Sequence, residues 1–259
     1  MEYKKIVEKY LSLDKELRLD KELRSRIAMY TDIIKILDRG YVCCNNDNIK
    51  GLPPTLLLTG LNPSFQKDKN PEPYSFQTAE GRYWKEKRDQ FGELKDSIPY
   101  LDLFPIRESH QKEGFEKTFR NANDITARFL EITQQAIEDI APKMIIHANR
   151  DSMYYWGIKK YGRGNDEKNP WMGYRVERIT RYNTPDLPQC MTDEKLSIFP
   201  LYRIVGLIDS FERINRLSIT KTNLTYIMEY VMGYRNPKDK ERFLYKPHEW
   251  LEISNWLNK

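Results

Sequence analysis

The chain has 259 residues, of which 39% are hydrophobic and 12% aromatic, including seventeen Tyr and five Trp. This apolar content is ample for a buried core, so the composition excludes a globally disordered chain. Lys and Arg total 43 against 38 acidic residues, a formal net charge of +5 that permits a polyanionic partner without requiring one. The length fits one large domain or a core with appended segments.

Neither a membrane nor a metal is expected as a partner. No stretch approaches the ~18 consecutive apolar residues of a membrane span, and the first residues are charged and amphipathic rather than signal-like. Cys43 and Cys44 are adjacent and Cys190 is distant, which does not suit zinc or iron–sulfur ligation. We therefore predict a cytoplasmic protein with reduced thiols and without a bound metal or other cofactor.

The first forty residues are predicted to be a helical extension. Apolar residues recur there in steps of three and four, the spacing of one helix face, at Leu23, Ile27, Tyr30, Ile34 and Leu37. Gly40 is a plausible end of the last helix. The extension is interpreted as helices packed on their own domain, with a short coiled-coil or dimer arm as the alternative.

The rest of the chain alternates predicted strands and helices. Short apolar or alternating runs predict strands at residues 55–59, 100–104, 144–147, 173–180 and 195–199. Periodic segments predict helices at about residues 82–88, 122–140, 151–157, 206–217, 222–234 and 248–257. The segments 65–75 and 162–170 are predicted to be loops.

This alternation predicts an α/β protein. We expect a three-layer α/β/α fold with a four-stranded, mostly parallel central sheet and helical N- and C-terminal extensions. The expected division is an extension over 1–40, a core over 41–217 and a C-terminal helical extension over 218–259 that packs on the core.

Three polar loops follow three of the predicted strands. They begin at Gly60, Asp102 and His147 and carry Asn62 and Asn149 among their polar residues. Because ligands of parallel sheets lie beyond the carboxyl ends of the strands, these loops are predicted to line one site. His147 is either part of that site or a hydrogen-bonded core histidine.

The turn Gly60-Leu-Asn-Pro resembles a motif of the uracil-DNA glycosylase superfamily, and Leu101-Asp-Leu-Phe-Pro105 is similar to a second segment of that family. The resemblance covers about residues 50–210. It implies a uracil-DNA glycosylase-like fold and a DNA-repair hydrolase that cuts the bond between a flipped, modified or mismatched base and its sugar. It also implies that Asn62 orients the attacking water, that Phe65 stacks on the base and that Ser64 contacts a phosphate.

Two departures from the family pattern favour an alternative, a catalytically silent nucleotide- or nucleic-acid-binding module. The family's His-Pro-Ser motif would fall at Phe199-Pro200-Leu201, where only the proline remains, with Arg203 as a possible replacement donor. Asp102 stands where uracil-specific members carry Asn. An ionised carboxylate accepts hydrogen bonds but cannot donate them, so Asp102 would prefer a base edge that presents N–H donors; a turn cap or a pair with Arg107 is the structural alternative.

The site predicted from the resemblance has one catalytic residue, Asn62. The predicted base- or substrate-binding residues are Gly60, Leu61, Pro63, Ser64, Phe65, Asp102, Phe104, Asn149, Phe199 and Arg203. Arg107 and Arg150 are the predicted phosphate or DNA contacts. The expected partner is DNA or a nucleobase or nucleotide ligand, while the oligomeric state stays open.

Overall fold

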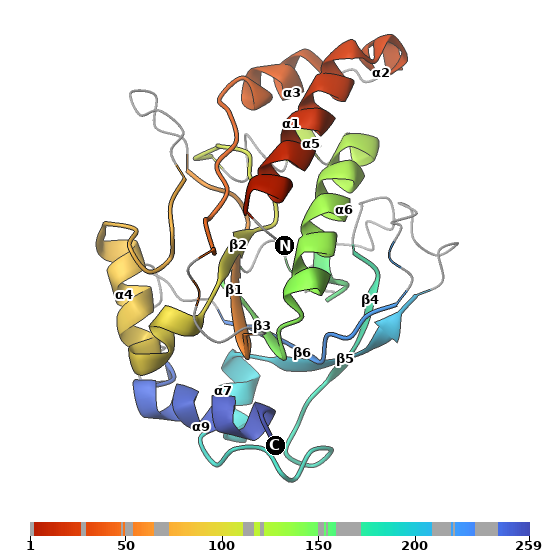
Figure 1. Ribbon diagram of the computed structural model, residues 1–259. Helices are drawn as coiled ribbons and strands as arrows, with labels where there is room; N and C mark the ends of the chain where they lie inside the picture. The colour runs from red at the N-terminus through yellow and green to blue at the C-terminus, as the bar shows by residue number, and fades with distance from the viewer. Residues whose placement is uncertain are drawn as a thin grey trace.

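A computed structural model describes residues 3–26, 30–47, 49, 54–64, 73–110, 117–119, 122–149, 153, 155–158, 172–208, 219, 221–230 and 243–259. At its centre lies a six-stranded sheet in the order β2-β1-β3-β6-β5-β4 (Figure 1). The strands are β1 (Leu56–Gly60), β2 (Tyr100–Asp102), β3 (Met144–His147), β4 (Tyr174–Arg178), β5 (Leu201–Leu207) and β6 (Tyr226–Glu229).

Four adjacent strands, β2, β1, β3 and β6, run parallel to one another. Strand β5 is antiparallel to both of its neighbours, β6 and β4, so the sheet as a whole is mixed. The α/β class is therefore confirmed, whereas the expected sheet of four strands is replaced by one of six.

Strands β5 and β6 were not predicted, and three predictions after residue 190 were wrong. Residues 206 and 207, predicted to begin a helix, are the end of β5. Residues 195–199, predicted as a strand, belong largely to helix α7 (Asp193–Ile198), whose first turn is capped by the Thr192 side chain accepting from the Lys195 amide. Residues 226–229, predicted within a helix, form β6. Short apolar runs do not distinguish a buried strand from a helix by periodicity, which explains the last two errors.

Helices cover both faces of the sheet. On one face packs α6 (Asn123–Ile140), with α1 (Tyr3–Leu19) alongside it. The same core continues to α5 (Lys117–Phe119) and to α2 (Lys21–Arg26) and α3 (Tyr30–Leu37), which lie beyond the strand ends in Figure 1. On the other face pack α4 (Arg82–Phe91), the 3₁₀ helix η1 (Gly92–Ser97), α7 and α9 (Pro247–Leu257). The side chains of β1 alternate accordingly: Leu57 belongs to the core under α6, and Leu56 and Leu58 to the core under α9.

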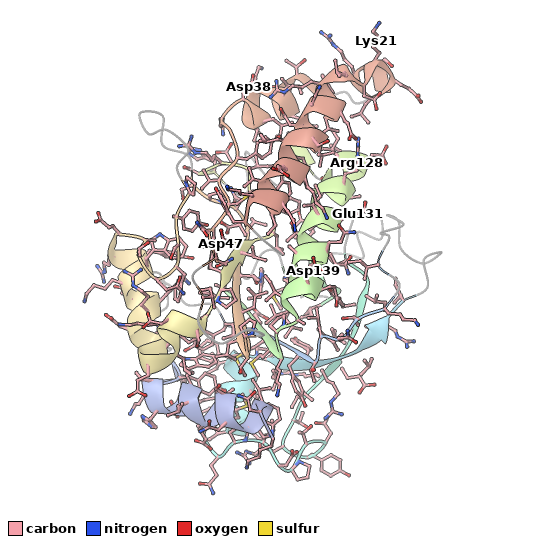
Figure 2. The ribbon with its side chains drawn as sticks, viewed as in Figure 1. Lys21, Asp38, Asp47, Arg128, Glu131 and Asp139 are labelled. Carbon is pink, nitrogen blue, oxygen red and sulfur yellow. The ribbon has the colours of Figure 1, made fainter. Side chains whose placement is uncertain are left out.

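The N-terminal helices are part of the core on the α6 side. Helix α1 lies along α6 in Figure 1, and Tyr10 stacks on Phe129 of α6 with ring centroids 5.9 Å apart. At the outer edge of this contact Arg128 pairs with Glu16 (Figure 2). Within its described residues, the predicted N-terminal extension is thus helical and packs on its own chain.

The C-terminal segment is not wholly helical, because it contributes β6 to the interior of the sheet, between β3 and β5. The predicted helix 248–257 and the strands at 100–104, 144–147 and 173–180 are present with small shifts at their ends. The loops 65–72 and 162–170 and the predicted helical segment 209–217 lie outside the described residues. In the part of the chain that is described, no helix is long and apolar enough to cross a membrane.

Candidate functional site at the carboxyl edge of the parallel strands

The four parallel strands end in Gly60, Asp102, His147 and Glu229. Gly60 is in register with Asp102, and His147 with Glu229. All three ionisable side chains are buried, with exposed fractions of 9% for Asp102, 2% for Glu229 and 0% for His147. Ionisable groups are seldom buried in this way, so this edge is the candidate functional site.

The loops after β1 and β2 are joined by main-chain hydrogen bonds. The amides of Leu103, Phe104 and Glu108 donate to the carbonyl oxygens of Gly60, Leu61 and Pro63, at 3.1, 2.9 and 3.0 Å. Two of the three predicted site loops therefore lie side by side.

Asn62 fastens these two loops together. Its side chain is 7% exposed, and its amide nitrogen donates to the main-chain oxygens of Pro63 (3.1 Å), Ile106 (3.2 Å) and Glu108 (2.8 Å). The donor end of the carboxamide is thus directed into the protein main chain. These three bonds hold the nitrogen of the carboxamide, whereas an attacking water would be oriented by its oxygen, so the water-orienting role that the resemblance implies stays a prediction.

Asp102 lies at the centre of a buried polar cluster. Its Oδ1 accepts from the Tyr100 hydroxyl at 2.8 Å and its Oδ2 from the Tyr74 hydroxyl at 2.6 Å. Gly60 makes this arrangement possible: a Cβ there would lie 2.1 Å from the Tyr100 hydroxyl oxygen and 2.3 Å from Asp102 Oδ1. The glycine of the turn is required by this close approach.

Lys87 of α4 adds a buried positive charge to the cluster. It is 2% exposed, and its Nζ lies 4.4 Å from the centre of the Tyr83 ring. Burial lowers the pKa of Lys87 to about 7, against the opposing influence of Asp102. Burial also raises the pKa of Asp102 to about 6, although both tyrosine hydroxyls and Lys87 lower it. Both groups consequently change charge near neutral pH.

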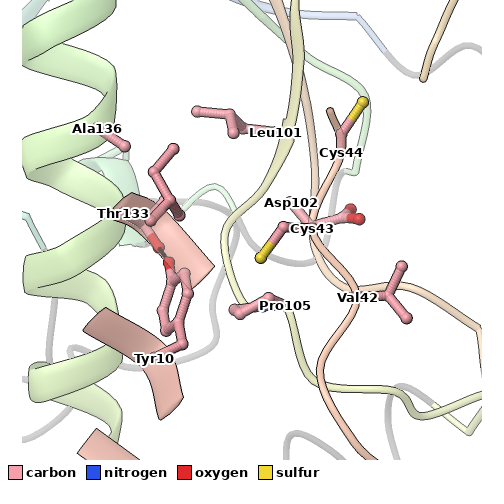
Figure 3. A pocket seen from close by; sticks show the side chains of 10 residues that line it. Tyr10, Val42, Cys43, Cys44, Leu101, Asp102, Pro105, Thr133 and Ala136 are labelled. Carbon is pink, nitrogen blue, oxygen red and sulfur yellow. Dashed lines mark hydrogen bonds between the residues drawn. The ribbon is translucent and has the colours of Figure 1, made fainter. Parts of the chain in front are cut away.

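A small hollow adjoins Asp102 on the α1 side (Figure 3). Tyr10 and Thr133 lie on one side of it, hydrogen-bonded to each other at 2.6 Å, with Cys43 facing them. The carboxylate of Asp102 points away from that pair. The hollow has room for about one water molecule, so a base would need additional space at this edge.

His147 is a core histidine. Its Nδ1 lies 2.8 Å from the Thr59 hydroxyl, and its ring makes an edge contact with Trp156 at 5.7 Å. Burial lowers its pKa to about 3, so the ring is neutral at physiological pH. The interpretation of His147 as a hydrogen-bonded core residue is confirmed.

The remaining predicted residues divide into three groups. Six of them follow the ends of β1, β2 and β3: Leu61, Pro63, Ser64, Phe104, Arg107 and Asn149. Leu61 and Phe104 are core residues, and Ser64 is exposed. Arg107 is buried, and its side chain donates to the main-chain oxygen of Arg39 at 3.0 Å. Phe199 lies beside Tyr230, the residue after β6, with ring centroids 4.5 Å apart, and so is at the same edge of the sheet. Arg203 is paired with the first residue of β6 and donates to Thr184, away from this edge. Phe65 and Arg150 lie outside the described residues.

The expected position of the second family motif was wrong. Phe199 and Pro200 precede β5, which is antiparallel to β6. The fourth parallel strand is β6, and it is followed by Tyr230 and then by residues 231–242, which are outside the described part of the chain.

Sequence reasoning missed Lys87, Tyr74 and Tyr100 as site residues. The segment Arg82–Arg88 was interpreted as an exposed helix with an aromatic underside, which holds for Lys85 but not for Lys87. The available signal was the spacing: Lys87 stands three residues after Trp84 and four before Phe91, so it lies on the same face of the helix as these two aromatic residues.

The described residues contain no group of three or more His, Cys, Asp or Glu side chains that could hold a metal ion. Comparisons of the chain with protein-family models, with curated proteins and with solved structures found no match. The family resemblance therefore stays a hypothesis that rests on the motif residues alone.

Proposed function

We propose that this protein binds a nucleobase or nucleotide at the carboxyl edge of β2, β1, β3 and β6, as a binding module and not as a glycosylase that depends on Asn62. The observation that carries this proposal is the buried carboxylate of Asp102 beside the Gly60 turn, at the edge where ligands of parallel sheets bind. The side-chain nitrogen of Asn62 donates to three main-chain oxygens and so fastens the two loops of this edge.

The polar cluster around Asp102 supports a ligand site at this edge. Removing a carboxylate and an ammonium from water is costly, so burial of Asp102 and Lys87 on neighbouring elements needs a reason other than stability. Strongly perturbed ionisable groups gather at functional sites. The resemblance of the Gly60–Pro63 turn to uracil-DNA glycosylases supplies the ligand class.

A DNA glycosylase is the second candidate, and one observation favours it. Asp102 and Lys87 both change charge close to neutral pH, as an acid–base pair in catalysis does. On this hypothesis the protein is a DNA-repair hydrolase of N-glycosidic bonds in which Asp102, and not Asn62, activates water.

Duplexes and single strands that carry uracil, hypoxanthine or an alkylated base distinguish the candidates. We expect binding, measured by fluorescence anisotropy at several salt concentrations, without formation of abasic sites. Abasic sites formed by the wild type would contradict the binding module. Their loss in Asp102→Asn, but not in the exposed control Asp96→Asn, would support the second candidate, and their loss in Asn62→Ala, but not in Gln77→Ala, would give Asn62 the water-orienting role. Gln77 is a matched control because its side-chain amide also donates to two main-chain oxygens, those of Lys95 and Ile98.

A further inference from the structure

The two outer edges of the sheet differ. At one end, the side chain of Asn46 closes β2: it donates to the Tyr100 carbonyl oxygen at 3.0 Å and accepts from the Tyr100 amide at 3.1 Å. At the other end lies β4, which pairs with β5 and, among the described residues, with no other strand or bridge (Figure 1). An open edge strand is a template for pairing with a further strand. The sheet can therefore grow at β4 but not at β2.

The hydrogen bonds at the two ends of β4 show which of its main-chain groups face outward. Before the strand, the Gly173 carbonyl oxygen accepts from the Ile208 amide at 2.9 Å. After it, the Ile179 amide donates to the Leu201 carbonyl oxygen at 2.8 Å. Residues of an antiparallel strand bond to their partner alternately, and the one slip in register skips a residue of β5 and leaves β4 regular. Val176 therefore directs both its amide and its carbonyl oxygen away from β5.

The side chains on either side of Val176 carry opposite charges. Arg175 and Glu177 are both exposed, and they point to the same face of the sheet because they are two positions apart. Within the chain, Glu177 is in register with Arg203 of β5, whose side chain donates to Thr184. The outer edge of β4 thus presents one positive and one negative side chain, placed symmetrically about an outward-facing main-chain group.

We propose that β4 pairs with β4 of a second copy of this chain, antiparallel and about a twofold axis at Val176. The Val176 amide of each copy donates to the Val176 carbonyl oxygen of the other. This register places Arg175 of each copy opposite Glu177 of the other, as a non-hydrogen-bonded pair in which side chains approach most closely. An axis at Arg175 or at Glu177 would bring like charges together, so charge selects the register. The half-buried Val176 side chains add an apolar contact on the α6 side.

The paired segment is short. The Arg178 carbonyl oxygen already accepts from the side chain of Asn183 at 3.0 Å, which closes the far end of β4. So few main-chain bonds support a weak dimer that forms only at high protein concentration. Because β4 and β2 lie at opposite ends of the sheet, the dimer leaves the site around Asp102 free and requires no ligand.

Sedimentation velocity of the full chain from about 10 µM to about 1 mM tests the dimer. We expect the wild type to change from monomer towards dimer across this range. Arg175→Glu and Glu177→Arg each replace two opposite-charge pairs by two like-charge pairs, so each should raise the Kd of the dimer at least about tenfold. Arg24→Glu makes the same change of net charge as Arg175→Glu at an exposed position of α2, and it should behave as the wild type does. A wild type that is monomeric at every concentration, or a Kd that neither β4 variant changes, would overturn the proposal.

A mixture of the two β4 variants tests the register. Positions 175 and 177 are both negative in Arg175→Glu and both positive in Glu177→Arg, so in a mixed pair every charge faces its opposite. We expect fluorescently labelled Arg175→Glu, monomeric alone, to dimerise when Glu177→Arg is added, with a Kd within about threefold of the wild-type value. This heterodimer would also show that both variants fold. Dimerisation of the wild type without any heterodimer would overturn the pairing of Arg175 with Glu177.

Val176→Pro tests the main-chain pairing. Proline is tolerated in an edge strand where the missing N–H faces away from the ladder, so the variant should fold with a urea midpoint close to that of the wild type. It should nevertheless lose the dimer, whereas the matched control Val176→Thr keeps the N–H and the β-branched shape and should retain it. A dimer that survives in Val176→Pro would place the contact elsewhere and overturn the proposal. If Val176→Pro fails to fold, the charge variants and their mixture still decide the question.

Discussion

The side-chain amide of Asn62 donates to the main-chain oxygen of Glu108 at 2.8 Å, a contact between residues 46 positions apart in the sequence. It closes a set of hydrogen bonds that begins with the Leu103 amide and the Gly60 oxygen. The loops after β1 and β2 are consequently held as one unit, and the Gly-Leu-Asn-Pro turn has a structural requirement for its asparagine.

Asn62→Ala is expected to lower the free energy of unfolding by about 1–3 kcal/mol. The alanine leaves buried main-chain oxygens without the donor that they have in the native protein, and such unsatisfied groups cost this much. Urea denaturation of the variant measures the loss. Ser64→Ala, two residues further along the same turn, is exposed and should change the free energy by less than about 0.5 kcal/mol. Similar stability of the two variants would contradict the fastening role of Asn62.

Gly60→Ala is expected to destabilise the protein although alanine suits a strand better than glycine does. Its Cβ would meet the Tyr100 hydroxyl oxygen at 2.1 Å and Asp102 Oδ1 at 2.3 Å, and insertions of this kind cost roughly 1–3 kcal/mol. The double variant Gly60→Ala with Tyr100→Phe removes one of the two clashes. It should recover part of the loss, and a coupling energy of zero in this double-mutant cycle would show that the clash is absent.

Much of the fold follows from hydrophobic periodicity. The long helix α6 and the buried strands β1 and β3 were predicted close to their observed ends, because long periodic segments and apolar runs bounded by turns carry a strong local signal. Strand β6 was missed because its four residues lie in a segment with equally good helix formers. Its place between β3 and β5 depends on pairing with residues more than twenty positions away, which no local pattern contains.

The candidate site was predicted less completely. The carboxyl ends of the parallel strands were located correctly, and Gly60 and Asp102 are neighbours there as expected. The fastening role of Asn62 was not predicted, because its hydrogen-bond partners, the oxygens of Ile106 and Glu108, are main-chain atoms that a side-chain pattern does not reveal. Lys87 was missed because the burial of this helix face depends on distant segments: Trp84, three residues before Lys87, packs on Tyr74 and Tyr100.

His147 is expected to make the protein less stable as the pH falls below about 6.5. Its pKa is about 3 in the folded protein and 6.5 in the unfolded chain, so between these values only the unfolded chain takes up the proton. The neutral, buried ring contributes its full share to the free energy of unfolding above pH 6.5. That free energy falls by up to about 1.4 kcal/mol for each pH unit as the pH goes from 6.5 to 3. His147→Gln should flatten this dependence in denaturation measured from pH 7.5 to 5. His248→Gln, which alters an exposed histidine of α9, is the control.

Tyr10→Ala is expected to cost about 3–5 kcal/mol, because α1 is part of the core and not a separate arm. Tyr10 is 3% exposed, stacks on Phe129 and shares a hydrogen bond with Thr133. Tyr10→Phe keeps the ring and loses the hydroxyl contact, so it should cost only about 1 kcal/mol. Leu11→Ala, on the exposed side of the same helix, is the control for helix propensity. A loss in Leu11→Ala as large as that in Tyr10→Ala would indicate that this helix is stabilised through its outer face.

Asp102→Asn is expected to stabilise the protein at pH 7.5. The pKa of Asp102 is about 6 in the folded protein and 3.8 in the unfolded chain, so the folded protein binds the extra proton between these values. The contribution of Asp102 to the free energy of unfolding is therefore highest below pH 3.8. Above pH 6, where the folded protein holds the carboxylate ionised, this free energy is lower by about 1–3 kcal/mol. The amide retains an acceptor for a tyrosine hydroxyl and carries no charge.

We expect the difference in free energy of unfolding between Asp102→Asn and wild type to grow from pH 4 to pH 7.5, and the exposed control Asp96→Asn to show no such growth. A variant that is equally destabilised at both pH values would mean that Asp102 is kept for the fold. A gain at pH 7.5 would mean that the carboxylate is retained at a cost in stability, as functional groups commonly are.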